Sequence, residues 1–281
     1  MIKVNDPIYG SHELPAVFED LLSGNTLKRL GNIHHSGAIF LVNPSICHNR
    51  LEHSIGVMLL IRILGGTELE QVAGLVHDIS HTAFSHVSDY VFGNEDETYH
   101  EQLFETVVSH SEVPFLLEKH GYTLEQLLNG QFSILEQPIP YLCADRLDYT
   151  LRDAMHSGII NRQQARHFLN FVTLVDGKVS VDNPEQAEWI NGIYKRLNTE
   201  VYNAPLYVYA NQQLAALINE LLKNGQLKEG DMQKDDTFML NKIRSTTYGY
   251  EAIKAIKHHK GYADFLKKGA SLKIKTRHLM A

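Results

Sequence analysis

Apolar residues recur at helical spacing along most of the chain. They predict helices over residues 19–30, 50–61, 68–78, 100–108, 141–155 and 235–245, and one or two long helices over 185–224. Gly31 and Gly65–Gly66 follow the first two segments, where glycine commonly ends a helix. Shorter amphipathic pieces are predicted over 122–130 and 134–136. Helices should therefore make up most of the regular structure.

Signals for strands are few. Residues 171–174 and 179–181 flank Asp176–Gly177 and predict a β-hairpin. A turn is predicted over 6–10 after strand-like residues, a strand or extended segment over 39–42, and a terminal strand over 271–277. No repeat or break in composition marks a second domain. We expect an all-α fold with one or two small β-hairpins, in a single domain over residues 1–281. Within it, a helical catalytic core spans about 25–160, and an accessory hairpin with C-terminal helices spans 171–281.

Composition limits the class of protein, the cellular compartment and the kinds of ligand that we expect. Hydrophobic residues make up 43% and charged residues 21% of the 281 residues, as in ordinary globular proteins. The two cysteines, Cys47 and Cys143, exclude a disulfide scaffold and favour a reducing compartment. Neither a membrane span nor a signal-peptide pattern is found, so we expect a cytoplasmic protein with no membrane partner. The net charge of −7 argues against an extended nucleic-acid surface but allows a small phosphorylated ligand.

Chemistry-bearing side chains concentrate in residues 76–89. This stretch contains His77, Asp78, His81, His86 and Asp89, and it directly follows an apolar run. Because a buried carboxylate needs a partner charge or a metal, an aspartate at the end of a buried helix is informative.

Two further candidates, His53 and Asp145, lie on other predicted helices. Together with His77 and Asp78 they could surround one divalent ion, and this mixed nitrogen and oxygen set suits Fe, Mn, Zn, Co or Ni, with Mg as a further option. A lone histidine on an apolar helix face is more often a core residue, so only the combination favours a metal.

The sequence around these positions resembles a known family. Residues 47–57, CHNRLEHSIGV, resemble its "HNRFEHSLGV" segment, and residues 144–153, ADRLDYTLRD, resemble its "DxDKxDYxxRD" helix. The order His53, His77–Asp78, Asp145 resembles the H…HD…D signature of the HD-domain metal-dependent phosphohydrolases. The resemblance spans nearly the whole chain and is closest to the deoxynucleoside triphosphate triphosphohydrolase-like branch.

This resemblance implies roles for individual residues. The metal ligands would be His53, His77, Asp78 and Asp145, and the catalytic residues beside them His81, His86, Asp89 and His100. Arg50 and Arg146 would clamp phosphate, while Tyr149 and Asp153 would contact the sugar. His81 would share a face with His77 if the helix continues. A homodimer or larger homo-oligomer is also implied.

Several residues have a structural interpretation instead. Asp148 and Arg152 favour a helix salt bridge. His34, His35, His110, His120, His258 and His259 are expected at the surface or in packing. The chain also departs from the family pattern, because Ser80 and Thr82–Ala83 replace glycine and Gly-Pro, and residues 197–209 contain no Lys or Arg.

The expected function is a metal-dependent phosphohydrolase that acts on a nucleotide or similar small phosphate ester or anhydride. A dNTP triphosphohydrolase is one form of this hypothesis. The alternatives are a non-catalytic nucleotide-binding or regulatory HD protein and, ranked lower because the Gly-Tyr-Pro companion motif is absent, a cyclic-nucleotide phosphodiesterase.

Overall fold

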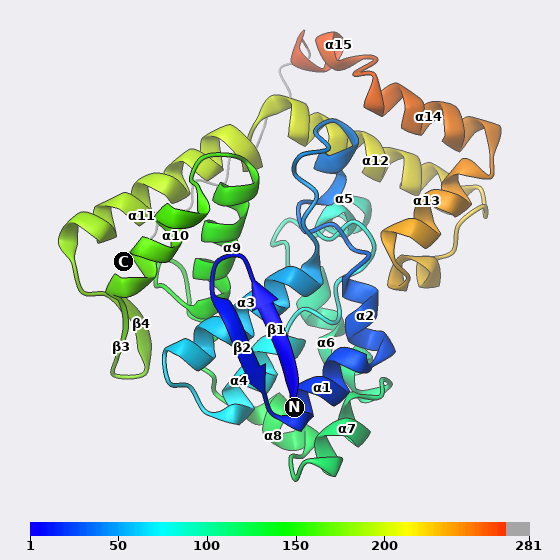
Figure 1. Cartoon of the computed structure of the whole chain (residues 1–281). Helices are drawn as coiled ribbons and strands as arrows, with labels where there is room; N and C mark the ends of the chain where they lie inside the picture. The colour runs from blue at the N-terminus through cyan, green and yellow to red at the C-terminus, as the bar shows by residue number, and fades with distance from the viewer. Residues whose placement is uncertain (268–281) are drawn as a thin grey trace.

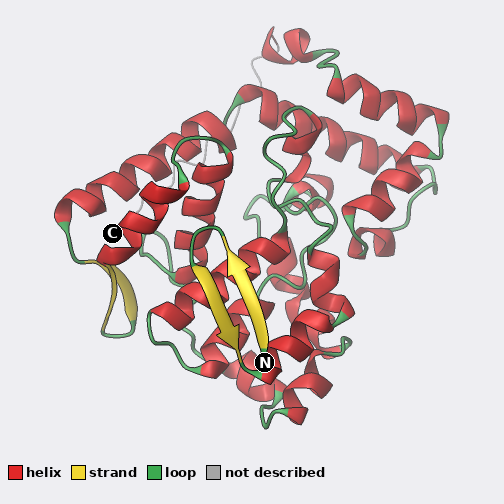
Figure 2. Ribbon diagram, in the orientation of Figure 1, coloured by secondary structure: helices red, strands yellow, loops and turns green. Residues whose placement is uncertain are grey.

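The structure, a computed structural model, describes residues 1–267, and helices account for most of it. Figure 2 shows helices throughout, with two small two-stranded hairpins. The all-α fold class with small hairpins is confirmed. The strand predicted over 271–277 lies outside the described residues.

The chain runs through the following helices and strands: β1 (Ile2–Asp6), β2 (Gly10–Leu14), α1 (Ala16–Ser23), α2 (Asn25–Leu30), α3 (Arg50–Ile63), α4 (Glu68–Val76), α5 (Val87–Phe92), α6 (Tyr99–Ser109), α7 (Val113–Lys119), α8 (Leu124–Asn129), α9 (Ala144–His156), α10 (Arg162–Phe168), β3 (Val172–Val175), β4 (Lys178–Val181), α11 (Pro184–Leu197), α12 (Pro205–Lys223), α13 (Asp236–Arg244), α14 (Thr247–Lys257) and α15 (Tyr262–Lys267). Single 3-10 turns cover Gly37–Leu41, Leu169–Phe171 and Glu229–Gln233, and a π-helical turn covers Asn198–Tyr202.

Both hairpins are antiparallel. In the first, Ile2 pairs with Leu14 and Asp6 pairs with Gly10, so the predicted turn over 6–10 is confirmed. The second pairs Val172 with Val181 across Asp176–Gly177, also as predicted. Figure 1 shows the N-terminal hairpin in front of α3 and α4. Asp6, the last residue of β1, is buried and accepts a hydrogen bond from Arg152 of α9.

The larger of two hydrophobic cores is built around α3, α4 and α9. The middle of α3, Val57–Ile61, is completely buried, and each such side chain contributes about 1.5–3 kcal/mol by leaving water. Helices α4 and α9 pack against α3 on different sides, while α1, α7, α10 and α11 close the core around them. This arrangement brings polar residues of α3, of α9 and of the turn directly after α4 toward a common point.

A second core is built by the C-terminal helices. Residues of α12, α13 and α14, including Leu217, Met239 and Ile253, cluster with Ala83, Phe84 and Val87 from the stretch before and at the start of α5. Figure 1 shows α12 running between the two parts, with α13 and α14 beyond it. The stretch that carries His81 and His86 therefore leaves the first core and is packed by the second.

Several helix boundaries differ from the predictions. The predicted helix over 19–30 is two helices, because Gly24 is extended and packs closely against the Glu112 carboxylate. Residues 39–42 belong mostly to a 3-10 turn rather than a strand. The helix predicted over 141–155 begins only at Ala144, after a cap by Cys143. Of the one or two long helices predicted over 185–224, the structure has two, α11 and α12, separated by a π-helical turn. Helices α14 and α15 had no predicted counterpart.

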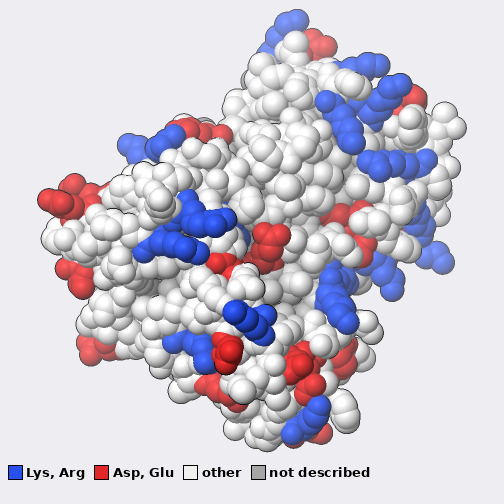
Figure 3. Space-filling model, in the orientation of Figure 1, with Lys and Arg blue, Asp and Glu red and all other residues white. Residues whose placement is uncertain are grey.

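Charge is distributed unevenly. Between residues 237 and 267 there are six Lys or Arg residues but only two acidic ones, Glu251 and Asp264. In Figure 3, blue side chains gather over these C-terminal helices, at the upper right of the view. The net charge of −7 therefore does not describe this part of the molecule. None of the helices over residues 1–267 combines the length and apolar character needed to cross a membrane.

Gly56 allows α3 and α9 to pack at close range. A Cβ atom at this position would lie 2.0 Å from Asp148 Oδ1 and 2.1 Å from Arg152 Nη2. By contrast, a Cβ atom on Gly192 of α11 would meet nothing within 4 Å. These two helical glycines should respond to alanine in opposite ways.

We expect Gly56→Ala to lower the free energy of unfolding by about 3 kcal/mol or more, because it overpacks a buried ion pair. Gly192→Ala should raise it by about 0.5–1 kcal/mol, since alanine favours the helix and has free space. Urea denaturation of the two variants and the wild type measures both effects. Equal responses of the two variants would contradict this account of the packing.

Candidate metal centre

Four polar side chains meet where α3, α4 and α9 converge. His53 lies on α3, His77 and Asp78 directly follow α4, and Asp145 lies in the first turn of α9. The His53 Nε2 atom lies 2.9 Å from Asp145 Oδ1, and the His77 Nε2 atom lies 3.5 Å from the same oxygen. Asp78 completes the group, with its oxygens 3.7 Å from His53 Nε2 and 3.4 Å from His77 Nε2.

Helix ends set these positions. Asn49 caps α3 by accepting a hydrogen bond from the Glu52 backbone N–H, and this fixes His53 in the second turn. Helix α4 begins with a capping box between Thr67 and Glu70 and ends at Val76. The prediction that this helix reaches Asp78 is therefore wrong by two residues. Because the backbone turns there, His77 and Asp78 can face the same point although they are adjacent.

Each histidine is oriented through its other ring nitrogen. His53 Nδ1 lies 2.8 Å from Asp148 Oδ2, and His77 Nδ1 lies 2.8 Å from the Gly74 carbonyl oxygen. Both Nε2 atoms therefore face the carboxylates. His77 Nε2 is buried and has no hydrogen-bond partner. Histidines held in this way, together with two carboxylates, are a donor set that suits a divalent metal.

Asp148 is itself supported by a buried chain of charges. Arg152 donates to both oxygens of Asp148 at 2.9 Å, and its Nη2 atom also lies 2.9 Å from Asp6 Oδ2. Asp6 accepts hydrogen bonds from the backbone N–H groups of Ile8 and Tyr9. The predicted Asp148–Arg152 salt bridge is confirmed, and it also fixes the orientation of His53.

Burial and charge act in opposite directions in this cluster. Burial favours the neutral form of Asp148, but Arg152 and His53 lower its pKa to about 2. Burial likewise disfavours the charged form of His53, yet Asp145 and Asp148 raise its pKa to about 10. The carboxylates thus create a site that attracts positive charge.

Three histidines and one aspartate lie beside this cluster. His81 and His100 stack with ring centroids 3.8 Å apart, and the His86 ring lies 5.1 Å from the His81 ring. His86 Nδ1 lies 3.0 Å from Asp89 Oδ2, and Asp89 is buried rather than a surface residue. Because α4 ends at Val76, His81 does not continue its face but returns through a turn, with its Nε2 atom 3.3 Å from Asp78 Oδ1.

The stacked histidines favour the neutral form. Burial lowers the pKa of His100 to about 3, and burial together with Arg50 lowers the pKa of His81 well below its ordinary value. His81 Nε2 and His100 Nδ1 are buried without hydrogen-bond partners. These rings are therefore suited to hydrogen bonding with a ligand rather than to carrying charge.

The two arginines differ in position. Arg50 donates to Asp78 Oδ2 at 2.7 Å and to Ser85 Oγ at 2.9 Å, so it lies within the cluster. Arg146 instead donates to the carbonyl oxygens of Gln137 and Tyr141 and pairs with Glu136. The expected role of Arg146 as a phosphate clamp is not supported, because its guanidinium anchors the segment before α9.

Asp153 lies two turns after Asp145 on α9. Its oxygens accept hydrogen bonds at 2.6 Å from His48 Nε2 and from the Tyr202 hydroxyl. Tyr149, one turn earlier, lies with its hydroxyl 3.4 Å from that of Tyr194. The two predicted sugar contacts thus belong to a polar region next to the four-residue cluster.

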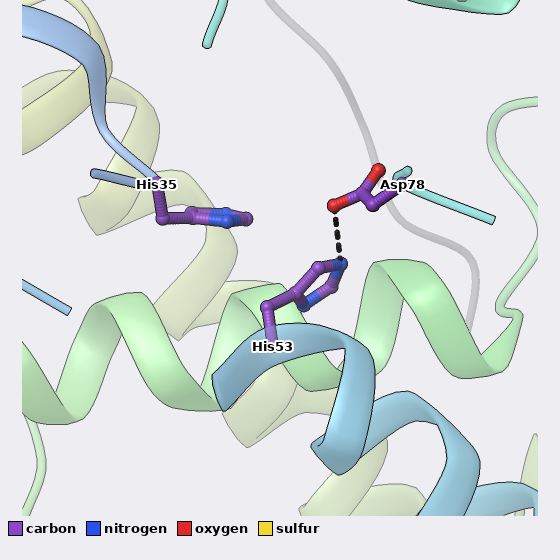
Figure 4. A group of neighbouring side chains, drawn as sticks. All are labelled: His35, His53 and Asp78. Carbon is purple, nitrogen blue, oxygen red and sulfur yellow. Dashed lines mark ion pairs between the residues drawn. The ribbon is translucent and has the colours of Figure 1, made fainter. Parts of the chain in front are cut away.

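His35, expected at the surface or in packing, is packed inside and was not expected to be part of the site. Figure 4 shows its ring beside His53 and Asp78, with an ion pair marked between the latter two. Its side chain is only 10% exposed, and its Nε2 atom lies 3.8 Å from Asp153 Oδ1. His35 therefore connects the cluster with the Asp153 region. Its only signal in the sequence was the adjacent pair His34–His35 shortly before the segment over 47–57.

Comparison with known proteins identifies the family. A family model for the HD domain matches residues 50–153. The chain is 32% identical over 238 residues to the metal-dependent phosphohydrolase cns2 of Cordyceps militaris, covering 81% of this chain and 68% of cns2. The chain belongs to the HD-domain metal-dependent phosphohydrolases.

Two further relatives are similar over different lengths. The uncharacterized protein YdhJ of Bacillus subtilis is 44% identical over 247 residues, covering 87% of this chain and 76% of YdhJ. Human deoxynucleoside triphosphate triphosphohydrolase SAMHD1 is 28% identical over 232 residues, covering 64% of this chain but only 36% of SAMHD1. The HD match includes all four cluster residues and ends before the C-terminal helices. That the four residues bind the metal remains a prediction.

Asp148→Asn should weaken divalent metal binding about 10–100-fold, because His53 loses the carboxylate that fixes its ring and increases its basicity. Isothermal titration with Mn²⁺ measures the affinity on folded protein. Asp176→Asn, in the exposed β3–β4 turn, is the matched control and should bind like the wild type. Equal affinities for the two variants would exclude this role of Asp148.

His156 should make stability depend on pH. It stacks on His48 with ring centroids 4.4 Å apart, and burial, His48 and Arg152 lower its pKa to about 4. Since its ordinary pKa is 6.5, the unfolded chain takes up the proton first, and stability falls as the pH drops from 6.5 toward about 4.

We expect His156→Asn to reduce the difference in Tm between about pH 7.5 and about pH 5, because the variant lacks a histidine whose pKa is lower in the folded protein than in the unfolded chain. Differential scanning calorimetry at both pH values gives the comparison. The exposed His258, replaced by Asn, serves as control and should leave the difference unchanged. If Tm changes between the two pH values as much in His156→Asn as in the wild type, His156 does not contribute to the pH dependence of stability.

Proposed function

We propose that this protein hydrolyses a phosphate ester or anhydride of a nucleotide or similar small substrate, using one divalent ion bound by His53, His77, Asp78 and Asp145. The observation that carries the proposal is the buried cluster itself, in which two oriented Nε2 atoms face two carboxylates. The unpartnered His77 Nε2 atom favours an electron-pair acceptor at this point.

When bound, the ion would neutralise charge on a phosphoryl oxygen and make a nearby water molecule more acidic. The surrounding side chains supply the rest of the chemistry. Arg50 presents a guanidinium beside Asp78, from where it can pair with a phosphate oxygen. His81 and His100 offer neutral rings for hydrogen bonds to the same group. Phosphoryl transfer depends mainly on such positioning and charge neutralisation.

His86 and Asp89 are suited to proton transfer. The Asp89 carboxylate binds His86 Nδ1 and also accepts a hydrogen bond from the Tyr99 backbone N–H, so it is fixed from two sides. The His86 side chain is 45% exposed, and its Nε2 atom remains available to a ligand. This arrangement supports His86 as the group that protonates the leaving oxygen.

The polar region around Asp153 supports a substrate with hydroxyl groups. Asp153, His35 and Tyr202 lie next to the cluster and offer both donors and acceptors. A nucleotide joins a phosphate to a sugar and would occupy both regions. The names of the relatives agree with this, since SAMHD1 is a deoxynucleoside triphosphate triphosphohydrolase.

Cleavage of a dNTP is the second candidate, favoured by that similarity. A triphosphate carries about four negative charges and needs several cations. In the described part of the chain, the Arg146 guanidinium donates to the segment over 136–141. Residues 197–209 supply Tyr202 to the Asp153 region but contain no Lys or Arg. These observations favour substrates with fewer phosphates.

The test is a screen of nucleoside monophosphates, dNTPs, sugar phosphates and cyclic dinucleotides with Mn²⁺, Fe²⁺, Co²⁺, Ni²⁺ and Mg²⁺. We expect the wild type to release phosphate from a nucleotide and to lose activity with a chelator. Asp78→Ala should lose about a thousandfold in kcat, because several kcal/mol of charge stabilisation are removed. Release of triphosphate from dNTPs would instead support the second candidate.

Asp96→Ala, in the loop before α6, is the control variant and should keep full activity. Metal content is measured in parallel on all three proteins. Activity that persists in Asp78→Ala would contradict the assignment of the site. Metal binding without turnover of any substrate would favour a nucleotide-binding regulator.

A further inference from the structure

The turn between His81 and His86 has an unusual backbone. Phe84 and Ser85 have φ angles of 61° and 52°, the left-handed region that disfavours residues other than glycine. Neither position is glycine. Two consecutive residues in this region persist only when the surroundings impose the conformation. Contacts from other segments must therefore hold the left-handed backbone of Phe84 and Ser85, directly before His86.

A single carboxylate from the C-terminal helices binds this turn. Asp236, the first residue of α13, is 1% exposed. Its Oδ1 atom accepts a hydrogen bond from the Phe84 backbone N–H at 2.6 Å. Its Oδ2 atom lies 2.9 Å from the His34 backbone nitrogen and 2.7 Å from His34 Nδ1. Asp236 thus ties the turn to the segment that carries His35.

Further hydrogen bonds connect this turn to the four-residue cluster of the candidate metal centre. The Ser85 hydroxyl donates to the His34 carbonyl oxygen at 2.7 Å and accepts from Arg50 Nε at 2.9 Å. Arg50 in turn donates to Asp78 Oδ2. A continuous set of hydrogen bonds therefore runs from Asp236 through His34 and Ser85 to a candidate metal ligand. His86 follows Ser85 immediately.

Packing reinforces the polar contacts. The Ala83 N–H donates to the Met232 carbonyl oxygen at 2.9 Å, and Phe84 is completely buried in the C-terminal core. Helix capping does not explain Asp236, because the neighbouring Asp235 is the residue that caps α13, by accepting from the Phe238 N–H at 2.8 Å. The Asp236 side chain is directed at the turn instead.

We propose that Asp236 is a positioning residue that holds the Phe84–Ser85 turn, and through it His86 and Arg50, in the geometry needed for phosphate hydrolysis. The proposal rests on the proposed function. It assigns to the C-terminal helices, which lie beyond the HD match, a direct part in shaping the site. Asp236 does not touch the cluster itself.

The test compares Asp236→Ala with Asp235→Ala. Asp236→Ala should lower kcat about 10–100-fold with metal content unchanged, because displacement of catalytic groups by about 1 Å has effects of this size. Asp235→Ala removes the helix cap and should lower Tm by a few degrees but leave kcat unchanged. Hydrogen exchange of the peptide over 80–88 should be faster in Asp236→Ala alone.

A second comparison separates positioning from a general loss of structure. In a His86→Ala background, Asp236→Ala should lower kcat by a smaller factor than in the wild-type background, because one of the two groups that it positions, His86, is already absent while Arg50 is still present. Asp236→Asn keeps the volume and one acceptor oxygen, so it should show a smaller loss, and it replaces Asp236→Ala if that variant does not fold. A kcat within about twofold of the wild type, or equal losses in both backgrounds, would overturn the proposal.

The exchange measurement keeps the two hypotheses apart. If the wild type hydrolyses no phosphate compound, the proposed function fails, whereas faster exchange at the turn in Asp236→Ala would still show that this carboxylate fixes it. If the wild type is active and exchange over 80–88 is the same in both variants, the positioning role is wrong and the proposed function stands.

Discussion

The site depends on a buried row of charges that runs from Asp6 through Arg152 and Asp148 to His53. None of these side chains is more than slightly exposed, so the low-polarity surroundings strengthen each interaction and make an unpaired member costly. The row joins the N-terminal hairpin to α9 and α9 to α3. Gly56 permits it, because any larger residue there would meet both Asp148 and Arg152. The orientation of the His53 imidazole in the candidate metal centre thus requires three separate segments to be folded.

The helical class and the central helices could be predicted because periodic apolar positions determine them. The segments over 50–61 and 235–245 correspond to α3 and α13 with shifts of only a few residues. The residues of the candidate cluster could also be predicted from the sequence, because they lie in short segments with distinctive spacing. The structure brings His53, His77, Asp78 and Asp145 together, although metal binding by them remains to be measured.

What could not be predicted depends on contacts between distant segments. His35 has no periodic signal, and its ring lies beside Asp78 in a segment that the bridge between His34 and Asn49 holds next to the start of α3. Arg146 seemed suited to a phosphate, but nearby carbonyl oxygens of the segment over 136–141 bind it. The departure at Ser80 and Thr82–Ala83 gave no indication of Asp236, which lies about 150 residues away in the sequence and binds the Phe84 backbone N–H.

The division into two hydrophobic cores has a thermodynamic consequence. Cooperative units of a protein can open at different free energies, and the unit with fewer buried contacts opens first. The C-terminal core is the smaller, and it packs Phe84 while the four-residue cluster belongs to the other. A partial opening of α12–α14 would leave the four-residue cluster assembled but release the Phe84–Ser85 turn that precedes His86. On the proposed function, such a state would keep the four candidate metal ligands together while His86 is displaced, so thermal inactivation would precede global unfolding.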